Sequence, residues 1–367
     1  MTLDLFLRTA QASGDHWGTT LKSALTALGP LPEDVNFGLI CVTVPLTEHL
    51  PSIMTFLRET TPIRGWSIAV GAGLTGPVGT VRDRPAIALL VARLPANAFR
   101  LIDSWKEPRR GQFLEQNKAW LAGQDMPVGL MQGDAFEADL PEMIADLAAS
   151  AHSFLVGGVG PGQPGGLSGV LLGAPLTLVT GLTQGCQTLP GRWRISEVTD
   201  EIIMQLDGKP ALDALKKAAG ENIAQDLHQA AGVIHLALPV PGSDRSSDYL
   251  VRSLLGIDPE RGWLAVGSRL SVGDEVLFVR RDNESAKKDM RRMLADIAGR
   301  VEGRTILGGL YFSCVARGAQ MFGTDEAEID MIGHALGSFP LIGVIAQGEF
   351  CHDRLYGYTG VLALILS

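Results

Sequence analysis

Polar side chains that could do chemistry follow two apolar segments in the last quarter of the chain. The first segment, Leu310–Phe312, runs into Ser313, Cys314 and Arg317, and the second ends at Glu349 and His352. If the two segments are neighbouring strands, these side chains lie near one sheet edge. An arginine can bind a carboxylate through two hydrogen bonds, and a glutamate can accept from an ammonium group. The pair therefore predicts a site for a free amino acid or a similar zwitterion.

Two other interpretations of this cluster stay open. Arg317 and Glu349 can pair with each other and fasten the strand ends. Cys314 can be a nucleophile if Arg317 lowers its pKa, or a buried, inert thiol.

A second unusual run, Gln184-Gly185-Cys186, follows the predicted strand 176–182. Its glycine shapes a loop whose amides and thiol could line the same cleft from the other side. The alternative is a plain surface turn.

Familiar catalytic motifs are absent from the sequence. There is no G-x-S-x-G elbow, no Walker phosphate loop, and no G-x-G-x-x-G run with the required acidic residue. The seven histidines include no H-x-x-x-H or H-E-x-x-H pair that would place two imidazoles on one helical face, and His235 fits a core histidine. We therefore expect no catalytic residue, no metal and no required cofactor.

Composition indicates a folded protein that does not bind nucleic acid. Of the 367 residues, 46% are hydrophobic and 19% charged, which is enough apolar surface for a core. The net charge of -9 comes without a basic run that could neutralise phosphates. The charge-free stretch 147–191 is interrupted by glycines and prolines, so no membrane span is expected. Four widely spaced cysteines and an opening without a secretory pattern predict a soluble, cytoplasmic protein with reduced thiols.

The order strand, helix, strand, strand recurs along the chain and predicts an α/β fold with mixed sheets covered by helices. Four copies are expected, with strands and helices in the ranges 35–92, 128–172, 233–279 and 306–366. The third copy would contain a helix at 246–255. Two copies make one domain, so we expect tandem domains 1–208 and 209–367, with a ligand cleft where they meet. A further amphipathic helix is predicted over 284–300.

Short motifs in a specific order make the chain resemble the FIST family, a two-part sensory module of bacterial signalling proteins. The run Phe312–Gly318 is similar to the family's F-S-C-x-x-R-G, and Gly348-Glu349-Phe350 is similar to its G-E-I/F signature. In the N-terminal part the resemblance rests on Leu155–Gly158, Gln184–Cys186 and the segment from Val198 to Leu212.

The resemblance implies a sensor that binds a small molecule, with amino acids the usual suggestion, and signals through a separate partner. The expected ligand-binding residues are Ser313, Cys314, Arg317, Glu349, Gln184, Gly185, Cys186 and His352. Some members resemble haem-binding nitric-oxide sensors that act on a histidine kinase, and here His352 or His235 would be the haem ligand. An alternative of another class is a cysteine-dependent enzyme using Cys314, and a further one is an interaction scaffold without a pocket.

Overall fold

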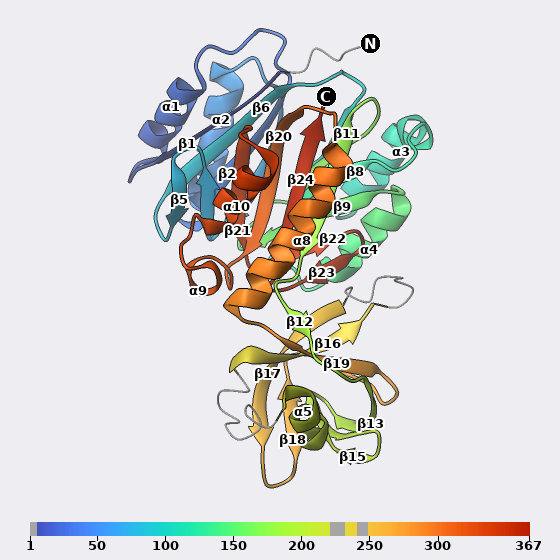
Figure 1. Cartoon of the computed structure of the whole chain (residues 1–367). Coiled ribbons are helices and arrows are strands. Elements are labelled where there is room, and N and C mark those ends of the chain that lie inside the picture. The colour runs from blue at the N-terminus through green and yellow to red at the C-terminus, as the bar shows by residue number, and fades with distance from the viewer. Residues whose placement is uncertain (1–5, 221–231, 241–248) are drawn as a thin grey trace. The chain divides into compact units, whose positions relative to one another are not determined.

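The computed structural model describes residues 6–220, 232–240 and 249–367 (Figure 1). Its contacts divide into two compact units. The first unit comprises Met1–Thr183 and Arg291–Ser367, and the second comprises Gln184–Met290. The second unit is therefore an insertion within the first, whereas the domains predicted from the sequence divide the chain at residue 208.

The first unit consists of three repeats with the same order of elements. The first repeat contains β1 (Phe6–Ser13), α1 (Trp17–Leu28), β2 (Phe37–Thr43), α2 (Leu50–Thr60), β3 (Gly65–Gly71) and β6 (Ala86–Arg93). The second contains β7 (Phe99–Ile102), α3 (Arg109–Ala122), β8 (Val128–Asp134), α4 (Leu140–Ser150), β9 (Phe154–Gly160) and β10 (Leu167–Leu172). The third contains β11 (Thr177–Thr183), α8 (Asn283–Val301), β20 (Ile306–Cys314), α10 (Ala327–Leu336), β21 (Leu341–Ala346) and β24 (Gly360–Leu366). Helix α8 begins in the second unit and enters the first at Arg291.

Strand pairing is the same in all three repeats. Strands β2 and β3 are parallel, as are β8 and β9, and β20 and β21. In each repeat the last strand, β6, β10 or β24, lies antiparallel between the first strand and the central one. A parallel pair needs a crossover, and α2, α4 and α10 provide it. Three of the four predicted copies are confirmed in this way.

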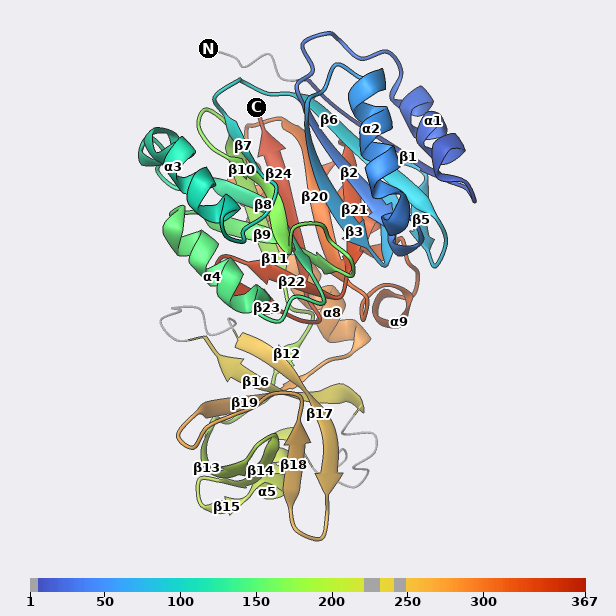
Figure 2. The same ribbon diagram turned by 180° about the vertical axis from the view of Figure 1, so that it is seen from behind.

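The three sheets share one apolar core, and their helices lie outside it. Leu39, Val156 and Phe312 come from the three different sheets and are packed in the same buried cluster. Figure 2 shows α1 and α2 on the outer face of the first sheet and α3 and α4 on that of the second. Each central strand is therefore buried on both faces, which explains its continuous run of apolar residues.

Two short hairpins and one glutamine side chain connect the three sheets. The first repeat contains η1 (Val44–His49) and the hairpin β4 (Gly73–Gly76) and β5 (Gly79–Arg82), and β4 pairs with β21 of the third repeat. The third repeat contains α9 (Ala319–Phe322) and the hairpin β22 (Gly348–Cys351) and β23 (Arg354–Tyr356), and β22 pairs with β9 of the second repeat. The second repeat has no hairpin at this point, and the side chain of Gln163 takes its place. Its Oε1 accepts from the Val70 N–H at 3.0 Å, and its Nε2 donates to the Ile68 carbonyl at 2.8 Å.

The parallel strands β3, β9 and β21 meet at their carboxyl ends. The Ala72 N–H donates to the Ile345 carbonyl, and the Gln347 N–H donates to the Val159 carbonyl, both at 2.8 Å. A Cβ on Gly160 would lie 1.8 Å from the Val70 carbonyl oxygen, so only glycine fits there. This close approach joins the three repeats into one unit.

The second unit is a small barrel that packs against helix α5. It contains β12 (Gln187–Thr188), β13 (Trp193–Thr199), β14 (Ile202–Leu206), β15 (Lys209–Pro210), α5 (Ala211–Ala219), β16 (Ile234–Pro239), β17 (Tyr249–Asp258), β18 (Trp263–Val266) and β19 (Glu275–Arg280). Pairing of β16 with both β17 and β19 closes the sheet. Leu212 and Leu215 of α5 are packed with Ile203 and Phe278 in its core.

The predicted third copy is wrong. The helix expected at 246–255 falls partly on 246–248, outside the described residues, and the rest is strand β17, which pairs antiparallel with β16 and β18. Tyr249 and Val251 alternate inward, so the period is two and not 3.6. The helix predicted over 284–300 is confirmed as α8, where Asp282 Oδ1 accepts from the Ser285 N–H at the start of the helix.

None of the helices in the described part of the chain is long and apolar enough to cross a membrane.

Candidate functional site

A buried carboxylate on α10 collects three donors from the third repeat. Tyr311 Oη donates to Glu328 Oε1 at 2.6 Å, and Ser313 Oγ donates to Glu328 Oε2 at 2.7 Å. Arg317 Nε donates to Glu328 Oε1 at 2.8 Å. The Arg317 guanidinium also lies over the ring of Phe322, with its Cζ 4.9 Å from the ring centroid. Tyr311 and Ser313 both point outward from β20 because they are two residues apart on one strand.

This cluster is a charged network inside the protein. Burial alone would raise the pKa of Glu328, but the Arg317 charge and the three donors hold it below its usual value. Burial opposes the charge of Arg317, and Glu328 more than offsets it, so the pKa of the guanidinium is raised. Burial and Glu328 raise the pKa of Tyr311 well above its ordinary value. Tyr311 is therefore a neutral donor to an ionised pair.

Glu349 lies in a second buried position and is held by Thr359. Its Oε2 accepts from the Thr359 hydroxyl at 2.7 Å and from the Thr359 N–H at 3.2 Å. Its Oε1 has no hydrogen-bond partner among the described residues. Complete burial raises the pKa of Glu349 to about 8, against the lowering effect of Thr359 and Arg317. The carboxyl group is thus mainly protonated at neutral pH.

Cys314 occupies the position in the third repeat that Asp134 has in the second, at the end of the central strand. The Asp134 carboxylate accepts from the N–H groups of Phe136 and Gly162, and the Cys314 sulfur faces the N–H groups of Ala316 and Tyr358. Burial and the Glu349 charge nevertheless raise the pKa of Cys314 to about 11. This environment is the opposite of the one that a thiol nucleophile requires.

An ion pair between repeats covers the Glu328 cluster. Arg82 of β5 donates through Nε to Asp325 Oδ1 at 2.9 Å, and Thr80 donates to the Asp325 carbonyl. A Cβ on Gly318 would lie 2.4 Å from Arg82 and 2.8 Å from Asp325. The space between this pair and Tyr311, Ser313 and Glu328 is about 10 Å³, which is the size of one water molecule.

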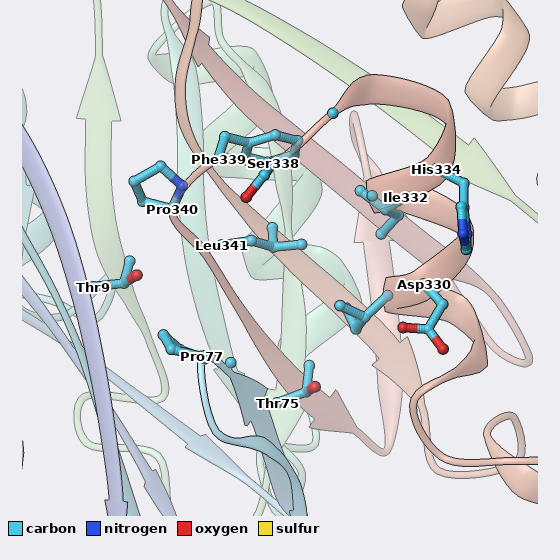
Figure 3. A pocket seen from close by; sticks show the side chains of 14 residues that line it. Thr9, Thr75, Pro77, Asp330, Ile332, His334, Ser338, Phe339, Pro340 and Leu341 are labelled. Carbon is cyan, nitrogen blue, oxygen red and sulfur yellow. The ribbon is translucent and has the colours of Figure 1, made fainter.

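A much larger cavity, of about 710 Å³, opens on the other side of α10. Thr9, Thr75 and Pro77 line it from the first repeat, and α10 and the turn into β21 line it from the third (Figure 3). In Figure 3, Thr9 and Pro77 lie across from the helix and Leu341 lies between them. The side chains that line the cavity are those of Thr9, Thr75, Pro77, Ile329, Asp330, Ile332, His334, Ser338, Phe339, Pro340 and Leu341.

Helix α10 borders both the cavity and the buried cluster. Glu328 points into the cluster, and the next two residues, Ile329 and Asp330, line the cavity. Thr75 and Ile329 line both the cavity and the small space beside Glu328. A molecule in the cavity would therefore touch the element that holds the ion pair.

The structure brings together four of the predicted site residues. Ser313, Cys314, Arg317 and Glu349 are all buried, and none of them lines the large cavity. Arg317 pairs with Glu328. Its connection to Glu349 is indirect: Arg317 donates to the Tyr358 carbonyl, and the next residue, Thr359, donates to Glu349. This differs from the direct Arg317–Glu349 pair considered above. Ligand binding by Arg317 and Glu349 stays a prediction.

The other predicted residues lie elsewhere. His352 is at a hairpin turn with φ of 62° and is stacked on Phe154, with the ring centroids 5.3 Å apart. Gln184, Gly185 and Cys186 belong to the second unit. There the Gln184 and Gly185 N–H groups donate to Asp289, and the Gln184 side chain donates to the Tyr249 carbonyl. These contacts hold the loop in place, and ligand binding by Gln184, Gly185 and Cys186 stays a prediction.

Neither proposed haem ligand borders the large cavity. His235 is on β16 in the barrel, where burial and Arg281 lower its pKa to about 4, and His352 is on the hairpin turn. Haem binding through His352 or His235 stays a prediction.

Sequence reasoning missed Glu328, Tyr311 and Thr359. One signal was available for Glu328. Residues four positions apart share a helix face, so Glu328 lies on the same face as Ile332, which is completely buried. A carboxylate on the apolar face of a helix needs an interior partner.

The fold and this site define a repeat-built α/β protein with an inserted barrel, and the family models identify its class. The FIST N domain model matches residues 36–209, and the FIST C domain model matches residues 211–352. The chain belongs to the FIST family.

Similar proteins of known sequence are uncharacterized. Protein MT0656 of Mycobacterium tuberculosis strain CDC 1551 is 33% identical over 201 residues, which are 52% of this chain and 51% of that protein. Protein Mb0898c of Mycobacterium bovis is 31% identical over 199 residues, which are 51% of this chain and 50% of that protein. The chain thus spans about half the length of the curated relatives it matches. Among solved structures, a cyanuric acid hydrolase from A. caulinodans aligns over 98% of this chain and 99% of its own, at 9% identity and a TM-score of 0.34.

Proposed function

We propose that this chain is a sensory module that binds a small polar molecule in the cavity beside α10. The observation that carries the proposal is that one helix lines a 710 Å³ cavity and also holds the buried Glu328 carboxylate. The volume lies within the range of small-molecule sites, and the lining combines apolar side chains with a few polar groups.

The ligand would act by favouring one position of α10. A ligand shifts a conformational equilibrium only by its difference in affinity for the two states. The contacts of the ligand with Ile329 and Asp330 would change if α10 moved. The hydrogen bonds of Glu328 would change with them, because Glu328 is on the same helix. The output would pass to a separate protein, for which the family resemblance suggests a signalling enzyme such as a histidine kinase.

Arg317 is a poor anchor for an amino acid in this arrangement. It is 2% exposed, and a ligand carboxylate would have to replace Glu328 as its partner. Leaving one charge of a buried pair unpaired costs about 3–5 kcal/mol. The cavity beside α10 is therefore the better candidate for the ligand.

The proposal is tested by thermal shift with a panel of amino acids, amines, carboxylic acids and sugars. Gly333 lines the cavity, and a Cβ there meets nothing within 4 Å, so Gly333→Phe is designed to place a ring in the cavity with no clash at Cβ. Gly299 of α8 is also exposed, helical and open, which makes Gly299→Phe the matched control.

A bound compound at about 100 times its Kd should raise Tm by roughly 3 °C or more in the wild type and in Gly299→Phe. The same compound should leave the Tm of Gly333→Phe unchanged. No shift with any compound, or an equal shift in Gly333→Phe, would refute the proposal.

A further inference from the structure

We infer that the cavity beside α10 binds an organic cation, a protonated amine attached to an apolar body. The inference rests on the proposed function and names the ligand class of that site. It is argued from the charge, the helix end and the ring that line the cavity.

The formal charge of the lining is negative. Asp330 contributes a carboxylate, and the lining contains neither lysine nor arginine. Arg82 lines only the small space beside Glu328, where it is paired with Asp325. A ligand carboxylate would therefore enter the cavity without a cationic partner, whereas an ammonium group would have one acceptor of opposite charge.

The carboxyl end of α10 also lines the cavity. The lining at this end is formed by Gly333, His334, Gly337 and Ser338. The Gly337 N–H donates to the Gly333 carbonyl. The last carbonyls of a helix have no partners within the helix, and the helix dipole places partial negative charge there. Cations are stabilised at this end, and the basic residue of the last turn is His334 rather than a lysine or an arginine.

Aromatic and apolar side chains complete a site for an amine with an apolar body. Phe339 contributes an aromatic ring to the lining, and the quadrupole of such a ring attracts a cation to its face. Pro77, Ile329 and Leu341 offer apolar surface, and the hydroxyls of Thr9 and Ser338 offer acceptors for N–H groups.

One further acceptor lies beneath the wall of the cavity. Gln11 is two residues from Thr9 on the same face of β1 and is 4% exposed. Its Oε1 has no hydrogen-bond partner among the described residues, and it lies 2.6 Å from where a Cβ on Gly76 would be. Gly76 lines the cavity, so the absence of a side chain leaves this oxygen close to it.

Three probes of nearly equal shape test the ligand class by isothermal titration at pH 7. They are 2-phenylethylammonium, neutral 2-phenylethanol and anionic 3-phenylpropionate. The ammonium should bind the wild-type chain at least roughly fivefold more tightly than either of the others, which is the size of one ion pair at a partly exposed site.

Two variants assign the effect to Asp330. Asp330→Asn keeps the shape and removes the charge, and it should weaken ammonium binding roughly fivefold with little effect on the alcohol. Asp213→Asn is the matched control, because Asp213 is also exposed in the first turn of a helix, α5 of the second unit. It should leave all three affinities unchanged.

The outcomes separate the two proposals. If the alcohol or the carboxylate binds as tightly as the ammonium, and Gly333→Phe abolishes that binding, the cavity is a ligand site but the cation class is wrong. An equal loss of ammonium binding in Asp330→Asn and Asp213→Asn would also overturn the cation class. If none of the probes binds while a compound of the thermal-shift panel still does, the cation class is wrong and the proposed function stands. If no compound of the panel binds either, or if Gly333→Phe binds the probes normally, the proposed function itself fails.

Discussion

Arg317 Nη2 lies 2.7 Å from Glu328 Oε1, and both side chains are almost fully buried. The pair joins the loop after β20 to α10, so two segments of the third repeat are held together by charge in the interior. Because the removal of one partner leaves the other charged and unsolvated, the pair is costly to break.

Loss of one partner should therefore be worse than loss of both. Arg317→Met and Glu328→Leu should each lower the free energy of unfolding of the first unit by about 3–5 kcal/mol. The double variant should lose less than the sum of the two, and a double-mutant cycle in urea measures the coupling. Additive losses would show that the two side chains do not interact.

The stability of the protein should depend on pH through Glu349. Burial raises its pKa from 4.5 to about 8, so the folded state holds a proton that the unfolded state has released between these values. The free energy of unfolding should fall as the pH rises from about 4.5 to about 8. Glu349→Gln removes the titrating group and should reduce this slope.

A companion variant tests the cause of this pKa. The Thr359 hydroxyl lowers the pKa of Glu349, so Thr359→Val should extend the falling slope to higher pH. Urea melts across the pH range measure both slopes. A slope in Glu349→Gln equal to that of the wild type would contradict the assignment.

The contact between Gly160 and Val70 should tolerate no side chain. A Cβ at residue 160 would lie 1.8 Å from the Val70 carbonyl oxygen, so Gly160→Ala should cost about 3 kcal/mol or more through displacement of the backbone. Gly299→Ala is the control, because a Cβ there meets nothing and alanine favours a helix by about 1 kcal/mol. A Gly160→Ala variant as stable as the wild type in chemical denaturation would refute this geometry.

Gln163 should be irreplaceable because its side chain substitutes for a strand. Gln163→Ala would leave the Val70 N–H and the Ile68 carbonyl unpaired, at about 1–3 kcal/mol each. Gln163→Glu keeps the acceptor but loses the donor, and should also be destabilising. The exposed Gln116→Ala on α3 should change the free energy of unfolding by less than about 0.5 kcal/mol. Equal stability of the three variants would contradict the role.

Alkylation should distinguish Cys351 from Cys314. Cys351 is half-buried, and the other three thiols are buried. Burial and Glu349 raise the pKa of Cys314 to about 11, so it is almost entirely protonated at pH 7. Iodoacetamide should first modify Cys351 in the native protein, as read by mass spectrometry, and Cys351→Ser should slow the overall reaction by roughly tenfold or more. Fast modification of Cys314 would support the thiol-enzyme alternative.

Local patterns in the chain were sufficient for most elements and for one side of the site. Alternating apolar runs and helices predicted three of the repeats, because a parallel pair with a crossover helix needs that order. The same order placed Ser313, Cys314 and Arg317 beside the end of β21, since neighbouring parallel strands end at one edge. The motifs around residues 312–318 and 348–350 also indicated the family, because they are local runs of sequence.

Three-dimensional packing alone settled which charges meet and where space remains. Arg317 pairs with Glu328 and not with Glu349, because α10 packs its Glu328 face against β20 while Thr359 holds Glu349. The insertion of the barrel and the cavity beside α10 depend on contacts between residues far apart in the chain, such as Arg82 with Asp325. Periodicity describes which face of an element is buried, but it does not specify the element that covers that face, and so the partners of these groups could not be inferred from it.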